Sequence, residues 1–331
     1  MAHGILERDF VLNGVDQAVD WHKKTICKGS PLEISDFPEM TGEEIYNADG
    51  KPVCIDGKPW RVPVTQDDGL PCGKPYCSDT FTLFTPRQGW QFVSEILAGT
   101  GYSVERIGML WNRSKWFISA HLQELKQVSR KGEAFQLNFS GGIDGTMSPQ
   151  AELSAIRAVC WNTISLSRMT GKALFKKKLT SGFTSALQAA KSGIEEACGM
   201  AAIFNQSMQN AEETSCEVQT AREIYMGATV REDIAKVAKI STTARNTVDG
   251  LVALYQRGDG NSGRTMADVV NGFTQYGTRG FDSSKKDVWT QLESSEFGGM
   301  ADRKAEFVGS VFNAEKREGL RVKGAQLLAM S

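Results

Sequence analysis

The sequence predicts an α+β protein, with an antiparallel β-sheet in its first half and a mainly helical second half. Residues 102–122 and 133–142 alternate apolar and polar side chains with a period of two, which is typical of strands. From residue 183 onward, apolar residues recur every three or four positions, which is typical of amphipathic helices. Because the strands precede the helices rather than alternating with them, the pattern favours α+β over α/β.

The composition is that of an ordinary globular protein and favours a reducing compartment. Of the 331 residues, 40% are hydrophobic and 23% are charged. No run approaches the roughly 20 apolar residues of a transmembrane helix, and the N-terminal segment has no apolar core of the signal-peptide kind. The seven cysteines are scattered and odd in number, which fits a cytoplasmic protein better than a disulfide scaffold.

Charge is distributed unevenly, although the formal net charge is only -1. Residues 100–182 contain 12 Lys and Arg against 5 Asp and Glu, whereas residues 1–99 contain 9 against 15 and residues 183–331 contain 17 against 19. A basic block between acidic flanks is the electrostatic pattern that attracts nucleic acid. The alternative is that the flanks fold back and neutralise the block.

Short strands and one helix are predicted before the sheet. Residues 28–80 are rich in Pro, Gly and Asp, which indicates turns between short strands. Residues 80–86 alternate in the manner of a strand. Residues 86–101 have the apolar spacing of a helix that ends at glycines.

The clearest strand signal is a hairpin over residues 102–125, turning at Asn112 to Ser114, with a third strand over residues 133–142. Large apolar residues occupy alternate positions of these runs, so we expect an antiparallel sheet with one buried and one solvent-exposed face. The face predicted to be buried carries Trp116, Ile118, Ala120, Leu122, Phe135, Leu137 and Phe139. The opposite face carries Lys115, Phe117, Ser119, His121, Gln136, Asn138 and Ser140.

A glycine-rich loop after the third strand is expected to lead into a helix over residues 148–168. Ser148 is a suitable N-cap, and Pro149 suits the first helical position. The expected apolar stripe of this helix is Leu153, Ile156, Cys160 and Ile164. Residues 171–182 then predict a short strand that carries several lysines.

The second half predicts a series of helices, the first with an amphipathic seam of about 26 residues from Phe183. So long a seam usually packs on another helix or on another copy of the chain. We therefore expect a strand-rich α+β domain over residues 1–182, with the basic segment 100–182, and a helical region over residues 183–331 that packs on it or mediates oligomerisation. Further helices are expected at residues 217–240, 242–257, 265–278 and 300–317.

Four stretches together resemble the phage/plasmid-like protein family, known as domain of unknown function 932. They are DWHKK at residues 20–24, IGMLWNRSKWFISAHL at 107–122, IDGTMSPQAELSAIRAVCWNTISLSR at 143–168, and TMADVVNGFTQYGTRGF at 265–281 with EFGGMADRKAEFV at 296–308. The run from Arg157 to Thr163 is the most specific part. The family commonly has His before the Asp-Gly pair, and this chain has Ile143 there, so a role of that His does not carry over.

The resemblance implies a virus or plasmid of bacteria, and hence the cytoplasm of a bacterial host cell. Members of the family travel with replication and recombination genes, which favours a nucleic-acid partner over metabolism. A weaker resemblance, in the order of strands and helix alone, is to phage single-strand annealing proteins. Those proteins form rings or filaments that hold single-stranded DNA in a basic groove.

The expected function is therefore single-stranded DNA binding and annealing without ATP by a homo-oligomeric recombination protein, with RNA left open as a ligand. Such binding needs cations along the phosphates and aromatic faces on which bases stack. The alternative for these cations and aromatic residues is that they form a solvated sheet face. The alternative function is that of a non-enzymatic protein-interaction protein or a structural protein of a phage. The candidate nucleic-acid-binding residues are Trp111, Arg113, Lys115, Arg130, Lys131, Arg157, Lys172, Lys176, Lys177 and Lys178.

We expect no enzyme, metal site or cofactor. The chain has three histidines and no constellation typical of a hydrolase or a nuclease, and Asp144 with Glu152 is a weak metal pair. Cys54, Cys72 and Cys77 lack the spacing of a zinc knuckle. The glycine-rich loop lacks the closing Gly-Lys-Ser/Thr of a phosphate loop. We expect Asn162 and Thr163 to have structural roles.

Overall fold

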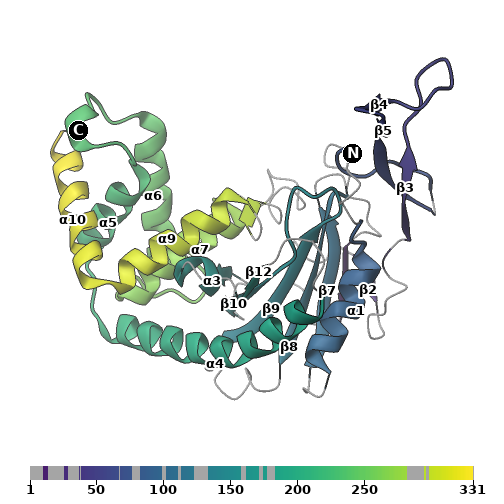
Figure 1. The fold of residues 1–331 in the computed structure, drawn as a ribbon. Helices are drawn as coiled ribbons and strands as arrows, with labels where there is room; N and C mark the ends of the chain where they lie inside the picture. The colour runs from purple at the N-terminus through teal and green to yellow at the C-terminus, as the bar shows by residue number, and fades with distance from the viewer. Residues whose placement is uncertain are drawn as a thin grey trace. The chain divides into compact units, whose positions relative to one another are not determined.

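The structure is a computed structural model of the 331-residue chain, and it has the α+β architecture that the sequence predicts (Figure 1). Most regular elements described before Phe183 are strands, and the chain is mainly helical from Phe183 onward. The residues that the structure describes are 10–13, 26–28, 37, 39–66, 68–76, 83–98, 102–110, 113–122, 133–157, 162–170, 174–176, 183–281, 294–295 and 298–330.

The main element is an eight-stranded sheet with the order β11-β10-β9-β8-β7-β1-β2, to which β12 adds by pairing with β10. β1 and β2 run parallel, whereas β1–β7, β7–β8, β8–β9 and β10–β12 are antiparallel pairs. The strands are β1 (Phe10–Asn13), β2 (Ile26–Lys28), β7 (Tyr102–Leu110), β8 (Lys115–Leu122), β9 (Glu133–Gly142), β10 (Gln150–Arg157), β11 (Asn162–Ser165) and β12 (Phe175–Lys176).

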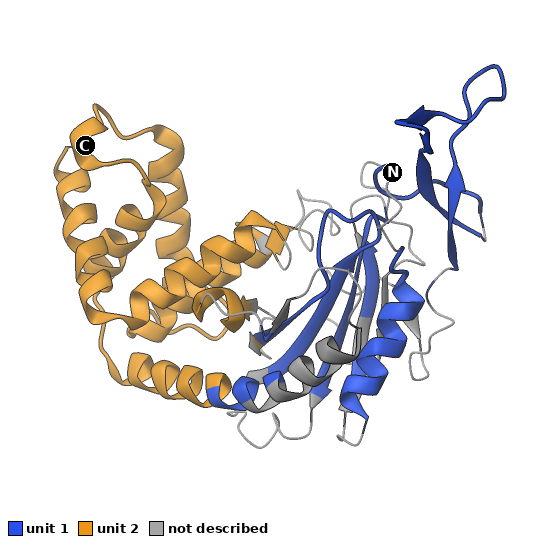
Figure 2. Cartoon of the chain, in the orientation of Figure 1, with its two compact units in different colours: residues 1–127, 135–154, 173–199 blue, residues 128–134, 155–172, 200–331 orange. Residues whose placement is uncertain are grey.

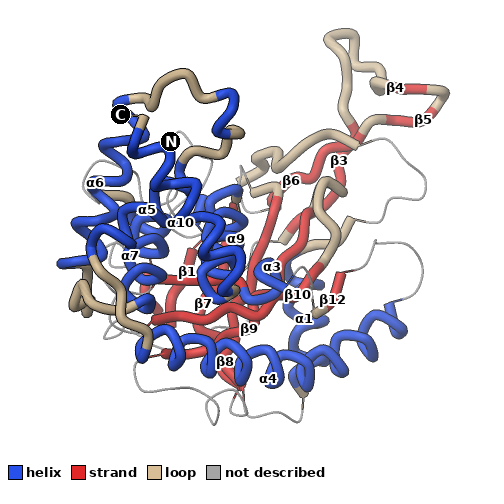
Figure 3. Tube along the Cα trace, turned by 90° about the vertical axis from the view of Figure 1, so that its left-hand side faces the viewer, coloured by secondary structure: helices blue, strands red, loops and turns tan. Residues whose placement is uncertain are grey.

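The predicted hairpin and third strand are confirmed as β7, β8 and β9, which lie side by side in Figure 3. Leu110 of β7 pairs with Lys115 of β8 next to the turn, and the register shifts once, between Val104 and Arg106. The short strand expected in the lysine-rich segment is confirmed as β12.

The helix predicted over residues 148–168 is wrong for most of its length, because the chain forms β10 and β11 there and is helical only from Leu166. Ala151, Leu153 and Ala155 are all buried, so the segment has the period of two of a strand. Pairing with β9 outweighs the local helix-start signal. Pro149 lies just before the first residue of β10, where a missing N–H group is tolerated in a sheet.

The helix predicted over residues 86–101 is confirmed as α1 (Pro86–Leu97). It begins with a capping box, in which the Thr85 side chain accepts from the Gln88 N–H group and the Gln88 side chain accepts from the Thr85 N–H group. Proline at the first helical position adds to this start signal.

Trp116 joins α1 to the sheet. Its indole is 1% exposed and lies between Gly89 of α1 and Gly141 of β9. A Cβ atom at either glycine would come within 2.7 Å of the indole ring. Gly141 therefore makes room for a core side chain within the strand, although the sequence suggests only a turn there.

The opposite face of the sheet is buried as well, so the predicted solvent-exposed face is wrong. Gln136, Asn138 and Ser140 are 1%, 7% and 4% exposed, and Ser119 is fully buried. Alternation separates the two faces of a strand, but it does not report whether the polar face is covered. Covered polar groups must then find hydrogen-bond partners inside the protein.

Two small antiparallel ribbons confirm the short strands expected between residues 28 and 80. One pairs β3 (Met40–Glu44) with β6 (Arg61–Thr65), and the other pairs β4 (Cys54–Ile55) with β5 (Lys58–Pro59). The β4–β5 ribbon extends away from the large sheet (Figures 1 and 3). The strand predicted at 80–86 falls partly outside the described residues, and residues 83–85 are not a strand.

The predicted helices after residue 183 are confirmed, with two breaks. A helix over 217–240 ends at Thr229, and a short 3₁₀ turn follows. The helix over 300–317 is interrupted at Asn313, whose side chain accepts from the Lys316 N–H group and so starts a new helix. The helices are α3 (Leu166–Thr170), α4 (Phe183–Glu213), α5 (Val218–Thr229), η4 (Ile234–Lys236), α6 (Thr242–Arg257), α7 (Met266–Arg279), α9 (Gly299–Phe312) and α10 (Ala314–Ala329).

The chain divides into two compact units, coloured separately in Figure 2. The first comprises residues 1–127, 135–154 and 173–199, and the second comprises residues 128–134, 155–172 and 200–331. The boundary predicted after residue 182 stays a prediction. None of the helices within the described residues is long and apolar enough to cross a membrane.

Within the second unit, α5 and α10 pack closely through two glycines. A Cβ atom at Gly227 of α5 would overlap the Leu320 carbonyl oxygen, and one at Gly324 of α10 would overlap the Glu223 carbonyl oxygen. Such backbone-to-backbone contact allows no larger side chain without moving a helix. Beside it, the rings of Phe273 and Phe307 stack with centroids 4.0 Å apart.

We expect Gly324→Ala to lower the free energy of unfolding by about 2 kcal/mol or more, because the added methyl group overlaps backbone atoms. Urea unfolding monitored by circular dichroism measures this loss. Gly319→Ala is the matched control, since it lies on the same helix with nothing within 4 Å of the added atom. The control should be neutral or stabilising by up to about 1 kcal/mol. Equal effects of the two substitutions would contradict the close packing of α5 and α10.

Candidate nucleic-acid interface

A network of buried hydrogen bonds lies on the polar face of the sheet, where the sequence places candidate binding residues. The Asn138 Oδ1 atom accepts from the Ser119 hydroxyl at 2.6 Å and from the Gln136 amide at 3.1 Å. The Asn138 amide donates to the Ser154 hydroxyl at 2.9 Å. The network joins β8, β9 and β10 through side chains, and its burial makes it a structural element rather than a contact surface.

Two candidate lysines lie on the first and the last of four neighbouring strands, β8, β9, β10 and β12, and we call this arrangement the lysine row. Lys115 of β8 pairs with Gly142 of β9, and Gln150 of β10 pairs with Lys176 of β12. β9 and β10 are neighbours joined by a short loop, which requires antiparallel pairing. The outer strands of the lysine row are therefore about 14 Å apart at the usual strand spacing.

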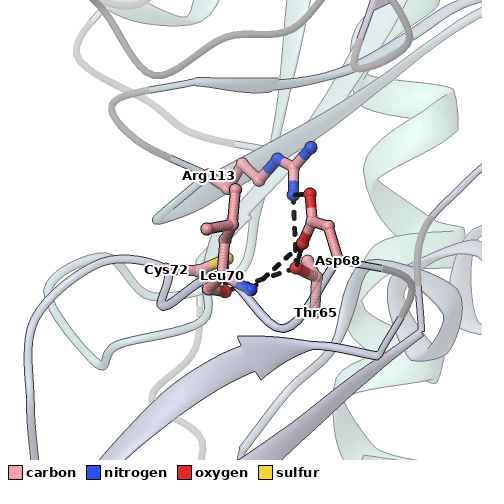
Figure 4. A network of polar contacts seen from close by, with 5 residues as sticks. All are labelled: Thr65, Asp68, Leu70, Cys72 and Arg113. Carbon is pink, nitrogen blue, oxygen red and sulfur yellow. Dashed lines mark hydrogen bonds and ion pairs between the residues drawn. The ribbon is translucent and has the colours of Figure 1, made fainter.

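Arg113 is not at the surface, which corrects its assignment as a nucleic-acid contact. It lies at the tip of the β7–β8 hairpin with φ 57° and is 3% exposed. Its Nη1 atom donates to Asp68 Oδ2 at 2.9 Å and to Thr65 Oγ1 at 3.2 Å (Figure 4). The left-handed conformation is costly for a residue with a side chain, and the buried ion pair offsets that cost.

Asp68 is the centre of this second network. Burial raises the pKa of its carboxyl group, but hydrogen bonds from Thr65 and from the Leu70 N–H group, together with Arg113, outweigh burial and hold the pKa well below its usual range. The Cys72 thiol donates to the Leu70 carbonyl oxygen at 3.5 Å. The loop after β6 is therefore fixed to the hairpin tip.

Asp144 joins a third loop to the same place. Its Oδ1 atom accepts from the N–H and hydroxyl groups of Thr146, and its Oδ2 atom accepts from the Lys74 N–H group at 3.2 Å. A Cβ atom at Gly73, which has φ 67°, would meet both Ser114 and this carboxylate within about 3 Å. The Asp-Gly motif thus holds loops together at one end of the sheet. Among the described residues, no group of three or more His, Cys, Asp or Glu could hold a metal ion.

The other sequence candidates are placed only in part. Arg157 and Lys176 have described backbones, on β10 and β12, but their side chains lie outside what the structure describes. The same holds for Asn162 and Thr163 on β11. Cys54 is exposed and Cys72 is buried. The candidates that lie wholly outside the described residues are Trp111, Arg130, Lys131, Lys172, Lys177, Lys178 and Cys77.

Sequence reasoning missed Asp68 and the structural role of Asn138. Asp68 lies in a turn-rich stretch 45 residues before its partner Arg113, and no local pattern joins the two. Alternation in the sequence places Asn138 on the polar face of its strand, but alternation does not indicate whether that face is buried.

One protein-family model matches most of the part of the chain that carries this geometry. The domain of unknown function DUF932 matches residues 76–295. The chain belongs to this family. The match covers most of the large sheet, including the hairpin, the Asp-Gly loop and the lysine-rich strand β12. Searches of curated proteins and of solved structures returned no match.

We expect Arg113→Met to destabilise the protein by about 1–3 kcal/mol at pH 7, because it leaves the Asp68 carboxylate without its cation. The pKa of Asp68 is lower in the folded state, so its stabilising effect is present above the unfolded-state pKa of about 3.9 and is lost as the pH falls through the folded-state pKa. The difference between wild type and variant should therefore narrow below about pH 4. Urea unfolding at a series of pH values measures it.

The control for this experiment is Arg61→Met, which removes an exposed ion pair with Glu44 at 3.5 Å. Exposed pairs contribute about 0–1 kcal/mol, so this variant should unfold nearly as the wild type does. If Arg113→Met lowered the free energy of unfolding no more than Arg61→Met does, the hairpin tip would not depend on the ion pair with Asp68.

Proposed function

We propose that the protein binds single-stranded DNA through the basic segment 100–182 and anneals complementary strands without ATP. The observation that carries the proposal is the row from Lys115 to Lys176, which crosses four neighbouring strands. Both lysines belong to the segment with 12 basic and 5 acidic residues. Cations spaced across a sheet are suited to follow a phosphate backbone without reading sequence.

The burial of the polar network restricts where a bound DNA strand lies on the sheet. Asn138 and Gln136 are 7% and 1% exposed, so bound DNA does not lie over the middle of that face. Lys115 is half-buried, at the end of β8 beside the loops held by Asp144. The proposed contact is therefore at this end of the sheet, where loop backbones are fixed and the lysine row begins.

Annealing, as distinct from binding, is supported by the recombination setting that the resemblance to phage and plasmid proteins implies. A groove that holds a strand by its phosphates leaves base edges free to pair with a second strand. In this proposal, a homo-oligomer in the cytoplasm of a bacterial host extends the groove over many nucleotides. RNA is the natural competitor ligand, because phosphate contacts alone do not distinguish the two backbones.

A second candidate function is protein interaction, favoured by the small ribbons of the first unit. Tyr46, Ile55 and Leu70 are 56%, 50% and 51% exposed, which is unusual for large apolar side chains in one short stretch. A partner protein that covers this stretch would bind without strong salt dependence. The two functions are therefore separable by salt titration.

We expect wild-type protein to bind a fluorescent oligonucleotide with an affinity that falls steeply with salt, as measured by anisotropy. Each neutralised phosphate contributes a log-log slope of about -0.7 for single strands. The variant Lys115→Gln/Lys176→Gln/Lys178→Gln should bind more weakly, with a slope shallower by about 2. Annealing of complementary strands should fall in the same variant.

The matched control removes three charges from exposed lysines of the second unit, as Lys236→Gln/Lys239→Gln/Lys316→Gln. It should retain both the affinity and the salt slope of the wild type. Absence of binding at low salt by folded wild-type protein would reject the DNA proposal, and equal losses in both triple variants would reject the row as the contact.

A further inference from the structure

The second unit contains a pocket of about 270 Å³ that the proposed DNA contact does not use. It opens between α5, α7, α9 and α10. Phe273 and Phe307 lie at its apolar side, and both are less than 5% exposed. The contact of Gly227 with the Leu320 backbone holds α5 and α10 together at the same place. The pocket is therefore formed by packed helices rather than by loops.

Three cations and one carboxylate line this pocket. Arg231 pairs with Glu306 at 3.1 Å, and both side chains are more than 60% exposed, so this pair lies at the rim. The Lys323 ammonium group donates to the Val230 carbonyl oxygen, which is a neutral partner. Arg303 forms no ion pair with any residue that the structure describes. Because Arg231 and Glu306 neutralise each other at the rim, the lining has a net charge of two positive charges, on Lys323 and Arg303.

We infer that this pocket binds a phosphoryl group. Two positive charges match the charge of a phosphate monoester, and the planar guanidinium of Arg303 can donate two parallel hydrogen bonds to it. Lys323 supplies a point charge, and the Ser310 hydroxyl is a further donor in the lining. The apolar aromatic side lowers the local dielectric constant, which strengthens the interaction of these charges with a ligand relative to open water.

The volume limits the size of the ligand. Pockets for drug-sized ligands are usually about 300–1,000 Å³, so 270 Å³ fits a phosphate with a small attached group rather than a dinucleotide. Two sources supply this chemistry: a free nucleoside monophosphate, or the 5′-phosphate at the end of a nucleic-acid strand. The inference does not depend on the lysine row of the first unit.

The test is isothermal titration calorimetry of the full chain at low salt with three probes. They are thymidine monophosphate, a short 5′-phosphorylated oligonucleotide, and the same oligonucleotide with a 5′-hydroxyl group. Thymidine monophosphate should bind to wild type, and Arg303→Gln should weaken it about tenfold or more, because a charge-assisted hydrogen-bonded partner is lost. Lys323→Gln should weaken it as well.

The control variant is Arg257→Gln, an exposed arginine at the end of α6 in the same unit, which should bind as the wild type does. The triple lysine variant of the first unit should also retain the binding, which separates this site from the proposed DNA contact. Preference for the 5′-phosphorylated over the 5′-hydroxyl oligonucleotide would assign the site to strand ends, and binding of the monophosphate alone would assign it to free nucleotide. Failure of every phosphate probe to bind wild type, or equal binding by Arg303→Gln, would overturn the inference.

Discussion

The large sheet depends on one constraint, which is that both of its faces are buried along the middle of β8, β9 and β10. A polar residue on a buried face must find its hydrogen-bond partner on a neighbouring strand. Asn138 meets this requirement by accepting from Ser119 and donating to Ser154. A slip of one residue would break these bonds and would also turn the Trp116 face away from α1. The network therefore fixes the register of β8, β9 and β10.

That register determines the geometry on which the proposed function rests. The strand order sets Lys115 and Lys176 on the outer strands of the lysine row, and the hairpin tip lies beside two other loops. Arg113 and Asp144 then hold those loops by bonds to Asp68 and Lys74. Residues that resemble a DNA-binding set in the sequence thus divide into two groups. Arg113 is part of the scaffold, whereas Lys115 remains a candidate contact.

The sequence was informative where a single period described a segment. The hairpin, the third strand, α1 and the boundaries of α6 followed from local alternation, spacing and caps. The sequence was misleading for the helix predicted over residues 148–168, where a proline start signal and a helical stripe competed with pairing to β9. The sequence could not predict the ion pair of Asp68 with Arg113, because a contact between turns far apart in the chain leaves no local pattern. The burial of Asn138 likewise depends on what covers the sheet, and the sequence of a single strand does not indicate that cover.

The most direct test of the account is photo-crosslinking of full-length protein to a 4-thiothymidine oligonucleotide, with the crosslinked peptides identified by mass spectrometry. The account predicts crosslinks in peptides from the basic segment 100–182, concentrated around Lys115 and Lys176, that decrease as salt is raised. An oligonucleotide that binds but crosslinks only outside this segment would contradict it.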